Sequence, residues 1–245
     1  MTETDAYRQR LYQSYVRLGD AEMEAPRFSI DAQRPALERL IRDHFPPDRD
    51  GAILDLGCGQ GTLIYIARAL GYRNLTGVDL SPVAVSRAKA LGIEGVSEGE
   101  LMATLAARPD ASLDAVVAFD VIEHFRKAEV LTFADQVCRV LRPGGRFIVH
   151  TCNAESPFAG IGRHGDFTHE VSFTKESIRQ VFLACGFRSV TSYEERPIPH
   201  GVKSTARWLL WHVFRAGLRL YRATETGHTG RDAIFSQDFL TVAVK

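Results

Sequence analysis

The feature that most constrains the fold is a regular alternation of short apolar runs and helical stretches that begins near residue 52. The run AILDL (52–56) ends at a glycine-rich turn, and NLTGVDL (74–80) ends just after an acid. The run LDAVVAFDV (113–121) is apolar almost throughout, as expected of a strand in a sheet that is covered on both faces. Strands that alternate with helices predict a parallel, doubly wound α/β sheet.

The boundaries of the elements follow from capping residues and apolar spacing. Ser81-Pro82 is typical of an N-cap followed by proline at the first helical position, and Gly71 is typical of a helix end. We expect helices over 8–16, 34–45, 62–71, 83–92, 128–141, 174–186 and 202–222. We expect strands over 52–56, 74–80, 93–96, 113–121, 145–151, 187–193 and 239–244.

These elements divide the chain into a short preface and a main domain. Pro46-Pro47 stops the first helical region, so residues 1–48 are predicted to form an N-terminal helical cap and 49–245 the main domain. Residues 153–173 are irregular and rich in Gly, Pro and His, and we expect them to form a lid loop over a substrate. Residues 196–233 are predicted to be a basic amphipathic helical insertion before the last strand.

The composition excludes several classes of protein. Lys and Arg together number 30, as do Asp and Glu, so no overall field favours nucleic acid, and no base-flipping Asn/Asp-Pro-Pro-Tyr motif is present. The cysteines are too widely spaced for a disulfide scaffold or a zinc knuckle. The N-terminus lacks an apolar signal core, and no long uncharged apolar run predicts a membrane span. We therefore expect a cytoplasmic globular protein.

The chemistry is carried by the segment DLGCGQG, which follows the first predicted strand. Glycines at this place allow a tight turn and let a ligand approach the backbone. The spacing is G-x-G-x-G rather than the G-x-G-x-x-G of dinucleotide-binding loops, which disfavours an NAD-dependent oxidoreductase. Asp55 precedes the loop and suits a cationic ligand, while Asp79 ends the second strand, where a carboxylate can accept ribose hydroxyls. The alternative is an ordinary strand-to-helix turn.

Four motifs together resemble a known family. DLGCGQG, TGVDLSP, FDVIEHF and VLRPGGRFIVHT occur in the order and spacing of class I S-adenosylmethionine (SAM) dependent methyltransferases, over roughly residues 50–190. The resemblance implies SAM as cofactor. With the elements above, the predicted fold is a doubly wound, mostly parallel, seven-stranded Rossmann-like sheet with an antiparallel last strand.

The resemblance also implies which residues bind the cofactor. Asp55 and the loop 57–61 would hold the methionine part, and Asp79 with Leu80 would hold the ribose. Glu100 matches the acid that reaches the adenine amino group, and Asp120 matches a contact to the methionine moiety. The complete set is Asp55, Gly57, Cys58, Gly59, Gly61, Asp79, Leu80, Glu100, Leu101 and Asp120.

Histidines are the candidates for a general base, which a hydroxyl acceptor needs. His124 follows the fourth predicted strand, and the lid loop carries His164, Asp166 and His169, of which we favour His169. The alternative is that the lid residues only cap turns and pack. Asp166, His169 and either Glu123 or His124 are also a conceivable set of ligands for a divalent ion, but sequence spacing defines no coordination sphere and we predict no metal site. His150 lies within the fifth strand and is predicted to be a satisfied core histidine.

The lid loop resembles that of bacterial methyltransferases associated with polysaccharide and other glycan biosynthesis. This resemblance implies O-methylation of a sugar, a glycan or a lipid-linked glycan. A small-molecule acceptor such as a quinone or secondary metabolite is the alternative, and a non-catalytic SAM-binding module is a further one.

The stretch 202–222 suggests a membrane contact. Leu209, Val213, Ala216 and Leu220 form an apolar stripe on a helical wheel, and the opposite arc interleaves Arg207, Arg215, Arg219 and Arg222 with Trp208, Trp211 and Leu218. One hypothesis is that the arginine and tryptophan arc lies in an anionic headgroup layer on the inner face of the cell membrane. The other is that the apolar stripe packs on the protein and leaves the arginines in water.

Overall fold

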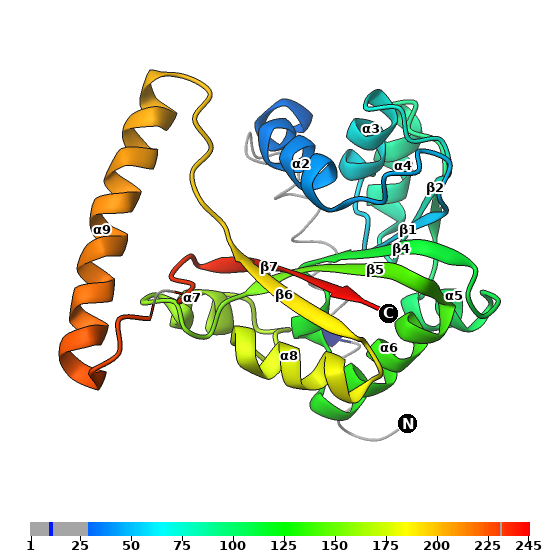
Figure 1. The fold of residues 1–245 in the computed structure, drawn as a ribbon. Helices are drawn as coiled ribbons and strands as arrows, with labels where there is room; N and C mark the ends of the chain where they lie inside the picture. Colours follow the sequence, from blue (N-terminus) through cyan, green and yellow to red (C-terminus); the bar gives the residue numbers. More distant parts are fainter. Residues whose placement is uncertain (1–9, 12–28, 231) are drawn as a thin grey trace.

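A computed structural model describes residues 10–11, 29–230 and 232–245, in which a seven-stranded sheet forms the centre of the fold (Figure 1). The strand order is β3-β2-β1-β4-β5-β7-β6, and β7 runs antiparallel to both of its neighbours. The strands are β1 (Ile53–Leu56), β2 (Leu75–Asp79), β3 (Val96–Glu98), β4 (Leu113–Phe119), β5 (Leu141–Cys152), β6 (Ser189–Glu194) and β7 (Asp238–Val244). The prediction of a mostly parallel sheet with an antiparallel last strand is confirmed.

Helices cover both faces of the sheet (Figure 1). On one side lie α2 (Ile30–His44), α3 (Thr62–Ala69) and α4 (Pro82–Ala90). On the other lie α5 (Leu101–Ala106), α6 (Lys127–Val140) and α8 (Lys175–Ala184). Three shorter or separate elements are the 3₁₀ turn η2 (Ile122–His124), α7 (Ala159–His164) and α9 (Val202–Thr226). The expected helix over 8–16 lies mostly outside the described residues.

Side-chain caps explain where several helices begin. The Ser29 side chain accepts from the Ala32 amide at the start of α2, four residues before the expected start at 34. Ser81 accepts from the Ala84 amide at the start of α4, with Pro82 as its first residue, as predicted. Thr174 accepts from the Ser177 amide at the start of α8, and Ser177 returns a bond to the Thr174 amide.

Two apolar clusters hold the layers together, one on each face of the sheet. The α2, α3 and α4 side contains Ile41, Ile64 and Ala88 packed on Ile53 and Val117. The other side contains a group of aromatic rings around Phe147 of β5, which is fully buried. The Phe147 ring lies 5.9 Å from that of Phe133, 5.2 Å from that of Phe182 and 6.0 Å from that of Phe187, measured between centroids. This cluster joins α6 and α8 to the sheet.

The structure differs from the expected elements at several further places. β3 covers 96–98 rather than 93–96, and the short helix α5 after it was not predicted. β5 begins at Leu141, which pairs with Leu113, and the register shifts before Arg146 pairs with Ala115. Within the predicted lid 153–173, α7 forms one short helix, and Asn153 pairs with Phe173 in an isolated bridge that closes the loop at its base.

The insertion 196–233 contains α9, which stands beside the body of the protein rather than on the face of the sheet (Figure 1). Arg215 donates to the nearly buried Glu194 carboxylate at 2.7 Å and to the Ala233 carbonyl at 3.2 Å. Leu209, Val213 and Leu220 are instead 55%, 67% and 69% exposed. Both orientations considered for this helix are therefore wrong, since Arg215 faces the protein and the apolar stripe faces outward. Within the described residues, no helix is long and apolar enough to cross a membrane.

Phe147→Ala is expected to lower the free energy of unfolding by about 3–5 kcal/mol, because the truncation removes a fully buried ring and leaves a cavity among three others. Urea unfolding measures this change. Leu131→Ala, at a side chain of α6 that is 44% exposed, is the control and should change stability by only about 0.5 kcal/mol. A Phe147 variant as stable as the control would show that this cluster is not the core.

Candidate active site

The turn after β1 is built from three glycines that all adopt left-handed backbone conformations, with φ of 72° at Gly57, 54° at Gly59 and 79° at Gly61. A Cβ atom at Gly57 would lie 2.6 Å from Val121 Cγ2, and one at Gly61 would lie 2.8 Å from Val96 Cγ2. At Gly59 it would meet nothing within 4 Å. Gly57 and Gly61 are thus required by packing, whereas Gly59 borders open space where a ligand can touch the backbone.

Asp79, the last residue of β2, holds this turn in place. Its Oδ2 accepts from the Gly59 amide at 2.7 Å, and its Oδ1 accepts from the Ser81 amide at 2.8 Å. Each carboxylate oxygen has a further lone pair, so Asp79 can still accept the two hydroxyls of a ribose. The next residue, Leu80, is 52% exposed and offers an apolar surface beside the carboxylate.

Asp55 lies buried in β1 next to the turn, with 3% of its surface exposed. Burial, together with the nearby Asp79 carboxylate, raises the pKa of Asp55 to about 7. A cation placed beside the two acids would offset the repulsion between them and favour the ionised form. The open space at Gly59, the diol acceptor Asp79 and this unmet need for positive charge all fit SAM, which carries a ribose and a cationic sulfonium. Cys58 adds packing, since its Sγ would touch a Cβ at Gly77.

Glu100 has a local role in addition to the predicted one. Its carboxylate accepts from the amides of Met102 at 3.0 Å and Ala103 at 2.6 Å, and so caps α5. The preceding Gly99 donates to the Asp79 carbonyl at 3.0 Å, which places Glu100 and Leu101 beside the end of β2. The predicted adenine contact stays a prediction, and the cap explains the helix that was missed here.

Asp120, directly after β4, has a left-handed backbone with φ of 51°, which is uncommon outside glycine. Its Oδ1 contacts Nδ1 of His150 at 2.6 Å, and the other ring nitrogen of His150 lies 3.3 Å from Glu195. Burial opposes the charged imidazolium, but the two carboxylates dominate and raise the pKa of His150 well above its usual value. His150 is therefore nearly buried, as predicted. Its charged ring also orients Asp120, which is one of the residues predicted to bind the cofactor.

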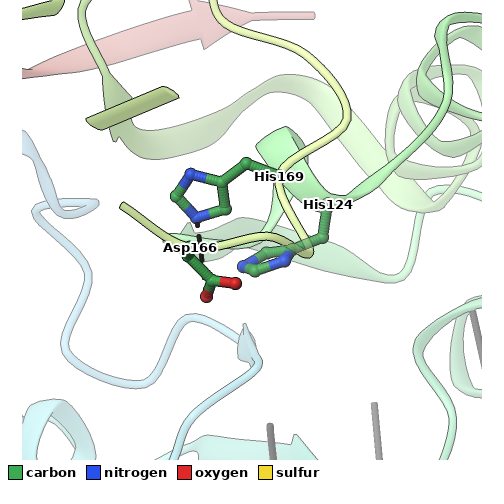
Figure 2. A group of neighbouring side chains, drawn as sticks. All are labelled: His124, Asp166 and His169. Atoms are coloured by element: carbon green, nitrogen blue, oxygen red, sulfur yellow. Dashed lines mark ion pairs between the residues drawn. The ribbon is translucent and has the colours of Figure 1, made fainter. Parts of the chain in front are cut away.

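Three further side chains meet next to this point (Figure 2). His124 comes from η2 after β4, and Asp166 and His169 come from the lid after α7. One metal-ligand type atom from each lies within 4.8 Å of the other two, and the two imidazole rings meet edge to face at 4.7 Å between centroids. The structure thus brings together three of the four residues predicted for catalysis. His164, the fourth, is exposed at the end of α7 and is not in this group.

Hydrogen bonds fix which nitrogen of each histidine is the acceptor. Nδ1 of His169 lies 2.6 Å from the Gly162 carbonyl, which only accepts, so this nitrogen carries the proton and Nε2 has the lone pair. The Thr168 hydroxyl donates to Asp166 at 2.7 Å and therefore accepts from Nδ1 of His124 at 2.8 Å. Burial and the neighbouring His169 lower the pKa of His124 to about 4, so this ring is neutral near pH 7.

Glu123 ties the lid to the sheet instead of joining this group. Its carbonyl accepts from the Glu170 and Val171 amides at 2.8 and 3.1 Å, and its carboxyl accepts from the Thr151 hydroxyl at 3.0 Å. Burial and Asp120 raise the pKa of Glu123 to about 8. Of the two alternatives considered for a metal ligand, the geometry therefore selects His124.

Asp79→Ala is expected to weaken SAM binding by about 1.5–3 kcal/mol, roughly ten- to a hundredfold, because charged hydrogen bonds are lost. Isothermal titration with SAM measures this loss. Asp43→Ala, at an exposed acid of α2, is the control. Gly59→Val should be more severe, since it adds strain at positive φ and fills the open space. Unchanged affinity in the Asp79 variant would contradict its assignment.

His150→Gln is expected to destabilise the protein most between about pH 5 and 6.5, by about 1–2 kcal/mol. A pKa raised by folding gives stability that is complete below the unfolded pKa of about 6.5 and is lost as the pH rises through the folded value. The effect is limited because the Asp120 and Glu195 side chains are 60% and 47% exposed. Unfolding of wild type, this variant and His164→Gln across pH tests it; an equal difference at pH 6 and pH 10 would exclude the charged pair.

Residues 30–192 match the family model described as a methyltransferase domain, which is more than half of the chain. The chain is 35% identical over 119 residues to a ribosomal protein L11 methyltransferase of Clostridium botulinum, covering 46% of this chain and 33% of that one. It is 36% identical over 104 residues to a ubiquinone biosynthesis O-methyltransferase of Methylobacterium sp., covering 41% of each. The chain thus matches about a third to two fifths of the length of these curated relatives.

The fold is similar to that of a SAM-dependent methyltransferase from Archaeoglobus fulgidus, with a TM-score of 0.68 at 20% identity, over 89% of this chain and 95% of that chain. Together with the family match and the glycine turn between Asp55 and Asp79, this similarity identifies the chain as a member of the class I SAM-dependent methyltransferases, with SAM as its cofactor.

Proposed function

We propose that the protein transfers the methyl group of SAM to a hydroxyl of a sugar, a glycan or a lipid-linked glycan. The observation that carries this proposal is the group of His124, Asp166 and His169 beside the cofactor residues. β1 and β4 are parallel neighbours, so the glycine turn and η2 follow the same edge of the sheet. An acceptor bound under the lid meets the histidines at this edge.

The chain's own residues have three tasks. SAM supplies a methyl group already activated by its sulfonium, so the protein mainly has to bind and orient the two reactants. Asp55, Asp79 and the turn between them bind the cofactor. Nε2 of His169 has the lone pair that can take the hydroxyl proton, and the resulting imidazolium has the Asp166 carboxylate 3.9 Å away. Gly162 holds the ring in the required tautomer.

The lid also supports an acceptor with an apolar part. Phe158, Ile161 and Phe167 belong to the same loop as these polar residues and are 60%, 62% and 76% exposed. A lipid-linked glycan combines hydroxyls with an apolar carrier. A phenolic small molecule such as a quinone precursor is the second candidate, and the ubiquinone-pathway relative favours it.

The same geometry also supports metal-assisted transfer. Two imidazole nitrogens and a carboxylate are ligands that many divalent ions accept, and each histidine is oriented by a hydrogen bond through its other nitrogen. In this version of the proposal His169 would be a ligand, and a divalent ion would lower the pKa of the acceptor hydroxyl in place of the ring taking its proton.

His169→Ala is expected to lower turnover by about 10²–10⁴-fold while SAM affinity is nearly unchanged, because a base acts on the acceptor and not on the cofactor. Mass spectrometry with labelled SAM measures methyl transfer to glycan extracts, lipid extracts and phenolic compounds, and His164→Ala is the matched control. Full turnover in the His169 variant would exclude it as the base.

A chelator distinguishes the metal-assisted reaction from the reaction in which His169 is the base. Loss of wild-type activity in EDTA, with recovery on addition of magnesium, would assign His169 to a metal site. Binding of SAM without transfer to any acceptor would favour a SAM-binding module.

A further inference from the structure

The outward face of α9 is unusually apolar for a surface helix. Only Ser204 of its 25 residues is buried, and its less exposed side includes Trp208, Trp211 and Arg215, the last of which pairs with Glu194. Large apolar side chains are more than half exposed along the opposite side: Val202 89%, Leu209 55%, Leu210 55%, Val213 67%, Phe214 65%, Leu220 69% and Tyr221 67%. Exposed apolar surface concentrated on one element is typical of an interaction site.

The charges around this face argue against an anionic membrane as the occupant. Arg215 is bound to Glu194, and Arg219 donates to the Thr229 carbonyl at 3.4 Å, so both point toward the protein. The exposed charges that remain are Lys203 and Arg207 near the start of the helix and Glu225 near its end. Anionic headgroups would repel Glu225, whereas a protein partner with a basic residue opposite Glu225 would attract it.

These charges are placed symmetrically about Phe214. Lys203 and Glu225 are each eleven residues from it, which is close to three helical turns, so all three lie on one line along the helix. Arg207 and Tyr221 are each seven residues from it, close to two turns, and lie near the same line. A second α9 laid antiparallel, with the two Phe214 rings in contact, therefore places Lys203 beside Glu225 and Arg207 beside Tyr221, and does so twice.

We infer that α9 pairs antiparallel with α9 of a second copy of this chain across a two-fold axis at Phe214. A two-fold interface requires that each contact occur in both directions, which this pattern meets with two ion pairs and two cation–π contacts. Gly217, next to the line, has no neighbour within 4 Å of a built Cβ and lets the helices approach closely. A single helix pair falls at or below the ~800 Å² per partner of a standard interface, so the dimer dissociates on dilution.

Sedimentation velocity over a range of protein concentrations tests this pairing. Wild type should shift from monomer to dimer as concentration rises, and Phe214→Glu should remain monomeric because it buries two like charges against each other. Leu91→Glu, at a comparably exposed (51%) leucine outside α9, is the control and should behave as wild type. Circular dichroism checks that each variant is folded.

Charge reversal at the ends of the helix tests the orientation without changing the apolar face. Lys203→Glu should weaken dimerisation, because it places two acids together at each end, and Lys203→Glu combined with Glu225→Lys should restore it. Flotation with vesicles of phosphatidylcholine and phosphatidylglycerol tests whether this face binds an anionic membrane instead.

Three results would overturn the inference. They are a wild-type protein that stays monomeric at every concentration, a dimer that Phe214→Glu leaves intact, and a double charge variant as weak as the single one. If the wild-type protein is a monomer that floats with vesicles, and the Phe214→Glu variant does not float, this face binds a lipid surface instead.

Discussion

The two hydrogen bonds accepted by Asp79 hold together the elements on which the whole site depends. One carboxylate oxygen binds the Gly59 amide in the turn after β1, and the other binds the Ser81 amide at the start of α4. A single side chain thus fixes the end of β2, the glycine turn and the first turn of a helix. Because the buried Asp55 lies close by, the same arrangement concentrates negative charge. The two acids therefore favour a cationic ligand at this site even before a ligand binds.

A second network connects the acceptor side to the sheet. Asp120 is linked through His150 to Glu195, which follows β6, and Glu123 holds the lid by its backbone. The cofactor edge, the lid and the chain leading to α9 therefore share neighbouring contacts. The contacts of His150 join the end of β4 to the residue that follows β6, so a change at Glu195 also affects the orientation of Asp120.

The sequence was sufficient for the central strands and for the cofactor turn, because these depend on local signals. β1, β2 and β4 are apolar runs between clear breaks, and Ser81-Pro82 marks α4. β3 has only three residues and α5 only six, so neither shows a clear apolar pattern, and β3 was misplaced and α5 missed.

The partners of His150 and Arg215 could not be predicted for a different reason. Asp120 and Glu195 are 30 and 45 positions from His150, and Glu194 is 21 from Arg215, so no local pattern reports these pairs. A helical wheel shows which residues of α9 share a side. It does not show which side turns inward, and in the structure Arg215 lies on the inward side, paired with Glu194.

The position of β7 has a consequence for how the chain acquires its structure. β7 lies between β5 and β6, yet it follows both of them and the 25 residues of α9 in the sequence. During synthesis β5 must therefore wait with one edge open and β6 without any partner, until residues 238–244 leave the ribosome and insert between them. A chain that is truncated within α9 would lack β7 and would expose two unpaired strand edges. Such a state is prone to aggregate.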